Sequence, residues 1–422
     1  MIDDPDRPST AGTLWQLVAI LAGSFALQIA GAALGLVVPL RMALDGRPAA
    51  LIGLTASANA VGFLIGCVGA ASLIRPIGHI RAFAVLAAVQ AIVTQVFALT
   101  DDPWLWVALR FVNGAVNAAQ FVIVESWVND RTPDVLRGRM MAIYVVCSRA
   151  GLIVGQMLPL AFTGTDAGAA LFIAASAAYS LALIPVALNR APSPAPPALA
   201  RMGLRELFAV APVSIVACFY AGFVGSTVVN VLPLYGVRIG LGNAAISVLA
   251  ALLQLGALAL QWPLGFLSDH RDRRIVMVGA AAATVVGGLV VALAPMPPFL
   301  VLAALIALGI GACQSVYAIG VAHAFDFAGR ERTVGLSSGL MLCWGIGAAL
   351  GPLVAAGAID RSGPGGLFLH AAAFSLAFVL FALWRMTRRP PRPPAEREKF
   401  VDVTATSPAA SRLDPRADRP SG

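Results

Sequence analysis

Twelve separate runs of apolar residues recur along this chain, and each is long enough to cross a lipid bilayer as a helix. A membrane-spanning helix needs about 20 mostly apolar residues. The runs cover residues 14–40, 51–74, 82–99, 104–128, 140–162, 167–188, 208–234, 244–267, 275–294, 299–322, 334–359 and 366–384. The pattern therefore predicts an all-α integral membrane protein with twelve transmembrane helices.

The composition agrees with a membrane location and excludes a nucleic-acid partner. Only 12% of the 422 residues are charged, against about 25% in soluble domains, so the apolar surface must face lipid. The formal net charge of +8 comes from arginines in short loops between the apolar runs, not from one basic face. The five cysteines all lie inside apolar runs without a CxxC pair, so we expect no disulfide, metal site or cofactor.

The chain divides into two halves of six predicted helices each. Four prolines between positions 192 and 197 mark a break that favours an extended linker. We expect a cytoplasmic tail at 1–13, six-helix bundles at 14–188 and 208–384, a cytoplasmic linker at 189–207 and a disordered cytoplasmic tail at 385–422. The sequences VVPL at 37–40 and VLPL at 231–234 end the first and seventh runs, which favours a duplicated, pseudo-symmetric six-helix unit.

The distribution of arginine predicts the orientation in the membrane. If the N-terminus is cytoplasmic, most of the loop arginines lie on the inner side, and only Arg41, Arg47, Arg238 and Arg361 lie on the outer side. Positive residues are retained on the cytoplasmic side of a membrane. We therefore expect both termini in the cytoplasm, as an even number of spans requires.

The most specific motif joins the eighth and ninth runs. Residues 265–274 read GFLSDHRDRR, which resembles the loop pattern G-x-L-x-D-R-x-G-R-R of the major facilitator superfamily. Physically, Gly265 lets two helices approach, and Asp269 can accept hydrogen bonds from backbone N–H groups at a neighbouring helix start and pair with an arginine. The equivalent first-half loop keeps Gly78 and Arg81 but has Arg75 where the pattern has aspartate. The resemblance implies a cytoplasmic gate built from Gly265, Asp269, Arg273, Arg274, Gly78 and Arg81.

Further segments support this resemblance and narrow it. The sequence RFVNG at 110–114 resembles the R-x-x-x-G motif that is associated with proton coupling in antiporters. Glycines at 151, 155, 345, 347 and 351 with Pro352 resemble the antiporter glycine-proline motif, and such glycines permit close helix packing and a bend. The stretches ESWVN at 125–129, QWP at 261–263 and YAIGVAHAFD at 317–326 are similar to the YcaD-like branch of the superfamily. The resemblance implies a monomeric transporter of the bacterial inner membrane, not an enzyme.

Charged residues inside the predicted spans are candidates for function, because a charge costs at least about 2.5–3.5 kcal/mol in the bilayer core. Arg149 lies about 17 Å beyond Gly138 along its helix, near the midplane, and Arg110 lies about 9 Å past Trp104. Proton coupling needs a group that titrates near the working pH. Glu125 is the first candidate, together with Arg110 of the antiporter motif and His323. Structural roles at helix ends are the alternative for Glu125 and His323.

Polar residues at helical spacing predict a substrate-binding cavity. Arg110, Asn113, Asn117 and Gln120 form one stripe, and in the resembling fold spans one, four, five, seven, eight and ten line the central cavity. The predicted substrate-binding residues are Arg149, Arg110, Asn117, Gln28, Gln156, Asn230, Gln254, Gln314 and Tyr317. Hydrogen bonding between helices is the competing explanation for each amide.

These residues predict a secondary active transporter that moves a small organic solute by alternating access, coupled to protons and favouring export. Two buried arginines against one carboxylate favour an anionic or zwitterionic solute, and lipid is the other expected partner. Two alternatives stay open: a cation-drug efflux pump, and a membrane sensor or scaffold on the same fold that binds a ligand without moving it.

Overall fold

The structure is a computed structural model that describes residues 10–132, 137–162, 167–188, 204–327, 333–388 and 400. Within these residues twelve helices are long and apolar enough to cross a membrane, which confirms the predicted fold class. The expected N-terminal tail up to residue 9, the linker at 189–203 and the C-terminal tail beyond 388, apart from Phe400, lie outside the described residues.

The first half consists of six spans, of which the fifth ends in a short 3-10 helix, η2 (Leu158–Ala161). The spans are α1 (Thr10–Leu44), α2 (Ala49–Ile77), α3 (His79–Leu99), α4 (Pro103–Arg131), α5 (Arg137–Met157) and α6 (Ala167–Ala187).

Helix capping and a glycine turn account for two of the helix ends in this half. The side chain of Asp102 caps α4 by accepting a hydrogen bond from Trp104 N at 3.0 Å. Gly78 joins α2 to α3 with φ of 77°, a left-handed conformation that favours glycine.

The second half repeats this architecture after a short helix, α7 (Leu204–Val210). The seventh span is assembled from three pieces: α8 (Pro212–Tyr220), the π-helix η3 (Ala221–Ser226) and α9 (Thr227–Arg238). The remaining spans are α10 (Asn243–His270), α11 (Arg273–Leu293), α12 (Phe299–Phe325), α13 (Thr333–Ser362) and α14 (Gly366–Arg388). Phe208, where the seventh span was predicted to begin, lies in α7. Ala211 leaves the helical conformation because Pro212 follows it.

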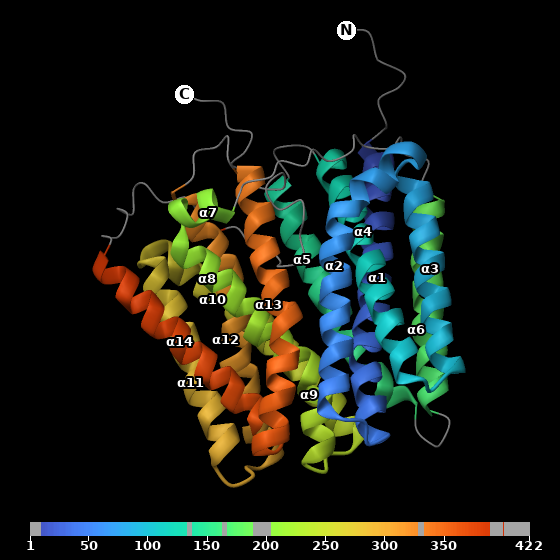
Figure 1. Cartoon of the computed structure of the whole chain (residues 1–422). Helices are drawn as coiled ribbons and strands as arrows, with labels where there is room; N and C mark the ends of the chain where they lie inside the picture. Colours follow the sequence, from blue (N-terminus) through green and yellow to red (C-terminus); the bar gives the residue numbers. More distant parts are fainter. Residues whose placement is uncertain are drawn as a thin grey trace, which may run out of the picture.

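Equivalent helices pair in the same way in both halves. In the first half α2 packs on α4, α1 on α5, and α3 on α6; in the second half α10 packs on α12, the seventh span on α13, and α11 on α14. The two halves stand side by side (Figure 1). Across the interface between the halves, α2 packs on α13 and α5 packs on α10. Each of these two contacts joins the second span of one half to the fifth span of the other, so the repeat relates one contact to the other. This arrangement supports the predicted duplication of a six-helix unit.

The outer faces of the helices are apolar, and the tightest contacts inside the halves are made at glycines. Trp104, Trp262 and Leu300 are among the large apolar side chains that are exposed on the protein surface, where lipid would contact them. On α4, Gly114 lies against the backbone carbonyl of Asn59 on α2, so the glycine of the R-x-x-x-G motif brings two backbones together. Helices in lipid associate largely through such close packing at small residues.

Replacing Gly114 with alanine is expected to destabilise the first half. The added Cβ would meet the Asn59 carbonyl oxygen and would lie 3.0 Å from Phe63 N, so α2 and α4 would have to separate. Overpacking of this kind costs about 1–3 kcal/mol. The apparent Tm of the purified protein in detergent checks this. Gly69→Ala on α2 is the matched control, because a Cβ there meets nothing within 4 Å. Equal Tm values for the two variants would contradict the expectation.

Candidate solute-binding site

A polar cavity lies between the two halves and consists of two adjoining chambers. The central chamber has a volume of about 250 Å³ and the second about 200 Å³. Both are lined by Gln28 and Asn117 of the first half and by Asn230 and Gln254 of the second, so the two chambers are continuous. Other residues of the central chamber are Asn59, Phe63, Phe121, Tyr144, Ser148, Arg149, Ser226, Gln261, Gln314, Tyr317 and Trp344.

Among the described residues that line the central chamber, Arg149 is the charged one, and its guanidinium faces three glutamines of the other half. Its Nη1 donates to Oε1 of Gln254 and to Oε1 of Gln314, each at 3.5 Å, and its Nη2 donates to Oε1 of Gln261 at 3.4 Å. Gln314 Nε2 in turn donates to Gln254 Oε1 at 3.4 Å. Arg149 comes from α5, whereas the glutamines come from α10 and α12. A single cation therefore bridges the two halves through neutral amide oxygens.

Aromatic side chains from both halves form part of the wall of the central chamber. The rings of Phe63 on α2 and Phe121 on α4 meet edge to face with centroids 6.2 Å apart. Phe63 makes the same kind of contact, also at 6.2 Å, with Trp344 on α13. Tyr144 and Tyr317 complete the aromatic part of the lining. The chamber thus offers one cation, several amides and apolar ring surfaces to a ligand.

Arg110 lines the second chamber and anchors a network inside the first half. Its Nη1 donates to Asn113 Oδ1 at 3.4 Å, and Asn113 Nδ2 donates to Gln90 Oε1 of α3 at 2.7 Å. The Nε–H of Arg110 is buried with no hydrogen-bond partner within the described part of the chain. For Asn113 the structure supports the competing explanation, a hydrogen bond between helices α3 and α4. Arg110 therefore keeps one buried N–H donor unpaired within the described part of the chain.

All nine predicted substrate-binding residues line one or both chambers, although their role in binding stays a prediction. Arg149, Gln314 and Tyr317 line the central chamber, Arg110 and Gln156 line the second, and Gln28, Asn117, Asn230 and Gln254 line both. The Asn230 amide is partly engaged, because its Nδ2 donates to the Ser226 carbonyl at 2.8 Å. Ser226 ends the π-helix of the seventh span, so this wider turn faces the cavity.

Sequence reasoning missed the contribution of spans two and eleven to the cavity. Ala56, Asn59 and Phe63 of α2 and Trp344 of α13 line it, whereas the resemblance implied only spans one, four, five, seven, eight and ten. Asn59, an amide inside an apolar run, was a signal that could have been found. The aromatic residues gave no signal, because aromatic side chains face lipid and cavity alike.

Glu125 and His323 lie at different places in the molecule. Glu125 is fully buried in the last part of α4, away from Arg110 by about 22 Å along the helix. Its carboxylate lies within electrostatic range of Cys67, Tyr144 and Tyr317, two of which line the central chamber. His323 lies near the end of α12, where its ring contacts Phe327 with centroids 5.1 Å apart. The three predicted proton-coupling residues therefore do not form one cluster.

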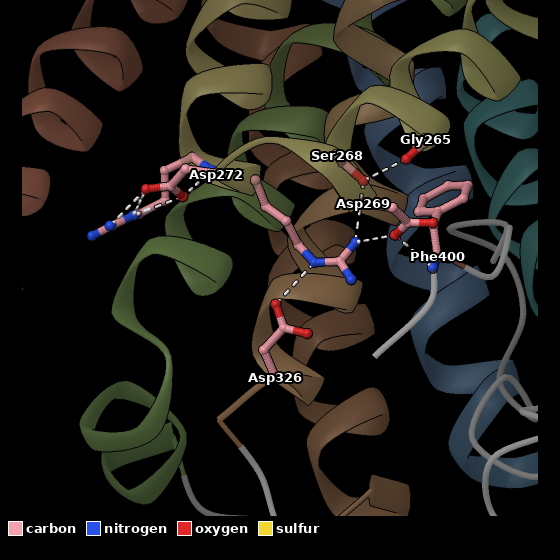
Figure 2. A network of polar contacts seen from close by, with 8 residues as sticks. Gly265, Ser268, Asp269, Asp272, Asp326 and Phe400 are labelled. Atoms are coloured by element: carbon pink, nitrogen blue, oxygen red, sulfur yellow. Dashed lines mark hydrogen bonds and ion pairs between the residues drawn. The ribbon is translucent and has the colours of Figure 1, made fainter. Parts of the chain in front are cut away.

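The predicted gate residues of the second half form a network at one end of the bundle (Figure 2). Arg273 is 1% exposed; its Nε donates to Asp326 Oδ2 at 2.9 Å and its Nη1 to Ser268 Oγ at 3.1 Å. Its Nη1 also lies 3.4 Å from Asp269 Oδ1. Arg274 instead pairs with Asp272, Nη2 to Oδ2 at 2.7 Å. Arg273 thereby connects the α10–α11 loop to the end of α12.

The corresponding loop of the first half is built differently. Gly78 forms the turn between α2 and α3, and Arg75 and Arg81 are both exposed on either side of it.

Within the described residues, no group of three His, Cys, Asp or Glu side chains could hold a metal ion.

Twelve spanning helices in two repeated halves, with a polar cavity between them, define a membrane transporter. The sequence model described as Major Facilitator Superfamily matches residues 20–259 and 238–417, and the chain belongs to this family. The predicted resemblance is confirmed, and with it a multi-pass protein of the bacterial inner membrane that belongs to the secondary transporters.

The curated relatives place the chain in the YcaD-like branch. It is 25% identical over 382 residues to a protein of Salmonella enteritidis PT4 named "Uncharacterized MFS-type transporter YcaD", covering 90% of this chain and 98% of that protein. A protein of the same name from Escherichia fergusonii is 26% identical over 373 residues, with 87% and 95% covered.

Solved structures share the fold at low sequence identity. The nucleoside transporter NupG superposes with a TM-score of 0.70 at 13% identity, covering 89% of this chain and 99% of that one. A bacterial homologue of the human lysosomal transporter Spinster, inward-facing and occupied, gives a TM-score of 0.70 at 16% identity, with 93% and 99% covered. The D-xylose-proton symporter gives 0.70 at 14% identity, with 89% and 97% covered.

The ion pair at Asp272 is expected to make stability depend on pH. Burial alone raises the pKa of Asp272, but hydrogen bonds from Arg274 and its charge outweigh this, so the pKa lies below its usual value. A depressed pKa contributes stability above the unfolded pKa of about 3.9, and this contribution disappears as the pH falls through the folded pKa. Asp272→Asn should therefore have a lower apparent Tm than wild type at pH 7, and the difference should shrink as the pH falls below about 4 in a pH 7 to pH 3 series.

The exposed Asp101 provides the control for this series. Its side chain is 75% exposed, so Asp101→Asn should leave the Tm unchanged across the range. A difference between wild type and Asp272→Asn that stays constant from pH 7 to pH 3 would contradict the expectation.

Proposed function

We propose that this protein exports a small organic anion or zwitterion across the inner membrane by alternating access, in exchange for protons. The observation that carries the proposal is Arg149, a cation that lines the cavity between the two halves and donates to three glutamine oxygens of the second half. The described residues that line the two chambers include Arg149 and Arg110 but neither aspartate nor glutamate. The electrostatic potential of such a cavity favours a negative group.

The hydrogen bonds from Arg149 to the three glutamines are long. Contacts of 3.4–3.5 Å to three amide oxygens lie at the long limit for N–H···O hydrogen bonds. A carboxylate or phosphate would offer shorter, charge-assisted bonds in the forked geometry that suits a guanidinium. A solute anion can therefore displace glutamine oxygens with a net gain, whereas a cation cannot.

The same network suggests how binding is coupled to movement of the halves. Arg149 belongs to the first half and its three glutamine partners belong to the second. A solute that binds Arg149 displaces some of the hydrogen bonds from Arg149 to these glutamines. It then contacts both halves itself. Because both halves contribute to one site, rocking of one against the other exposes the site alternately to each side of the membrane. One chain provides the whole site, which supports a monomer, and the loop arginines support cytoplasmic termini.

Glu125 is the group that we propose to carry the proton. It is fully buried, and a buried carboxyl responds strongly to nearby charge. Its position close to Tyr144 and Tyr317 couples it electrostatically to the wall of the central chamber. The antiporter glycines also agree with exchange: Gly151 and Gly155 of α5 pack against Phe25 and Ile29 of α1, a close contact along which two helices can slide.

The proposed solute class is tested by ligand stabilisation of the purified protein. Panels of organic anions, zwitterions and cations are screened against wild type and Arg149→Ala. A ligand at 100 times its Kd stabilises the native state by about 2.7 kcal/mol, so a binding anion should raise the apparent Tm of wild type. Arg149→Ala should lose at least about tenfold in affinity, because its cavity keeps the amides but loses the charge-assisted bond.

Arg361→Ala is the control for a non-specific effect of removing a positive charge, because Arg361 is exposed at the end of α13. It should bind the same anions with wild-type affinity. Cations that stabilise wild type and Arg149→Ala equally, with no response to anions, would overturn the proposed solute class.

The role of Glu125 is tested with an anion that the screen identifies. In inside-out vesicles, a pH-sensitive dye should report proton movement when the anion is added to wild type. Glu125→Gln should bind the anion within about threefold of wild type but abolish the proton movement, because glutamine cannot exchange a proton. Glu206→Gln, a change at an exposed position on α7, is the control. Proton movement at the wild-type rate in Glu125→Gln would exclude Glu125 as the carrier.

A further inference from the structure

One residue of the C-terminal tail contacts the two most characteristic residues of the gate loop. The backbone N–H of Phe400 donates to Asp269 Oδ1 at 2.8 Å, and the ring of Phe400 packs directly on Gly265 (Figure 2). Phe400 is partly buried against the hydrophobic core. It is also the only aromatic residue after Trp384 in the sequence. A single tail residue thus makes a polar and an apolar contact at the same place.

Gly265 and Asp269 suit this contact because they are four residues apart and share one face of α10. A Cβ at position 265 would overlap the Phe400 ring, so only glycine leaves room for it. Asp269 is held in place by Arg273 Nη1 at 3.4 Å, and Arg273 is itself fixed by Asp326 at 2.9 Å. The carboxylate is therefore oriented by contacts that do not involve the tail, and it is 28% exposed.

From the sequence, we expected Gly265 and Asp269 to serve the packing of another helix against α10. Gly265 provides close approach, and Asp269 provides an acceptor for backbone N–H groups. In this structure Phe400 supplies both the packing partner and the N–H donor. Because α10 packs on α5 of the other half, Gly265 and Asp269 lie on a helix of the interface between the halves. A helix of the first half cannot use these two residues while Phe400 occupies them.

The first half offers no equivalent acceptor in the corresponding loop. Its counterpart of Asp269 is Arg75, which is exposed at the end of α2. Of these two corresponding loops, the one that Phe400 contacts is therefore the one that offers an aspartate for closure of this side.

We propose that the loop face formed by Gly265 and Asp269 is a docking site for the chain's own C-terminal tail, and that the docked Phe400 restrains closure of this side. The tail competes with helix packing for one carboxylate and one glycine. Undocking of Phe400 frees both residues and shifts the population of the two halves toward the closed arrangement. The contact thereby gives the tail control over the transport cycle without any contribution to the solute cavity.

Docking itself is tested by hydrogen–deuterium exchange of the full-length protein in nanodiscs. The Phe400 amide should exchange at least about tenfold more slowly than the rate for an unstructured peptide, and Asp269→Ala should restore the fast rate. Because Asp269→Ala also removes a partner of Arg273, Gly265→Leu provides a second test that leaves the carboxylate in place. A Phe400 amide that exchanges at the unstructured rate in wild type would overturn the proposal.

The effect on the two halves is tested by a distance measurement. Spin labels at Arg75 of the first half and Phe208 of the second, both exposed, are introduced in a background without the five native cysteines. Phe400→Ala removes the ring, Phe400→Pro removes the N–H donor, and Val401→Ala is the neighbouring control. Both Phe400 variants should increase the short-distance population at least about twofold in pulsed EPR, and the control should match the parent. Unchanged distributions in both Phe400 variants would show that docking does not restrain closure.

Discussion

The requirement that backbone N–H and C=O groups find partners inside the lipid governs this structure. Only helices meet it here, since each helix satisfies its own backbone, and the sequence accordingly consists of apolar runs of helical length. Because lipid is as apolar as leucine, the helices gain little from burying apolar faces and associate through close packing instead. Gly114 against Asn59 is one such contact, and it also positions Asn59 and Phe63 at the wall of the cavity.

The same requirement concentrates polar chemistry between the halves. An arginine in a lipid-facing position would be costly, whereas Arg149 lies at an interface where three amides partly replace its water shell. Buried charges are stable only with such partners. The interface therefore holds a buried charge, and it is also the part that rearranges in the proposed alternating access.

The spans and most of the cavity could be predicted from the sequence because both produce local patterns along the chain. Apolar runs of about 18 residues or more indicate spans, and an amide or arginine inside such a run is conspicuous. Trp344 and Phe121 could not be predicted, since ring-bearing residues are equally common on lipid-facing sides. The π-helix at Ala221–Ser226 depends on how the seventh span packs on α13 and α14, which no local pattern reveals. Phe400 lies in a Pro- and Arg-rich tail without periodicity, so its contact with Asp269 was visible only in three dimensions.

The position of Arg149 also has an electrical consequence. The membrane potential acts on a charge within the bilayer with about 2.3 kcal/mol per 100 mV when that charge crosses the full field. A monoanion bound to Arg149 forms a pair with no net charge, so the field exerts almost no force on that pair. Without solute in the cavity, the field acts on the positive charge of the guanidinium itself. The voltage would therefore act mainly on the return of the carrier without solute, and the solute-loaded step would be almost insensitive to it.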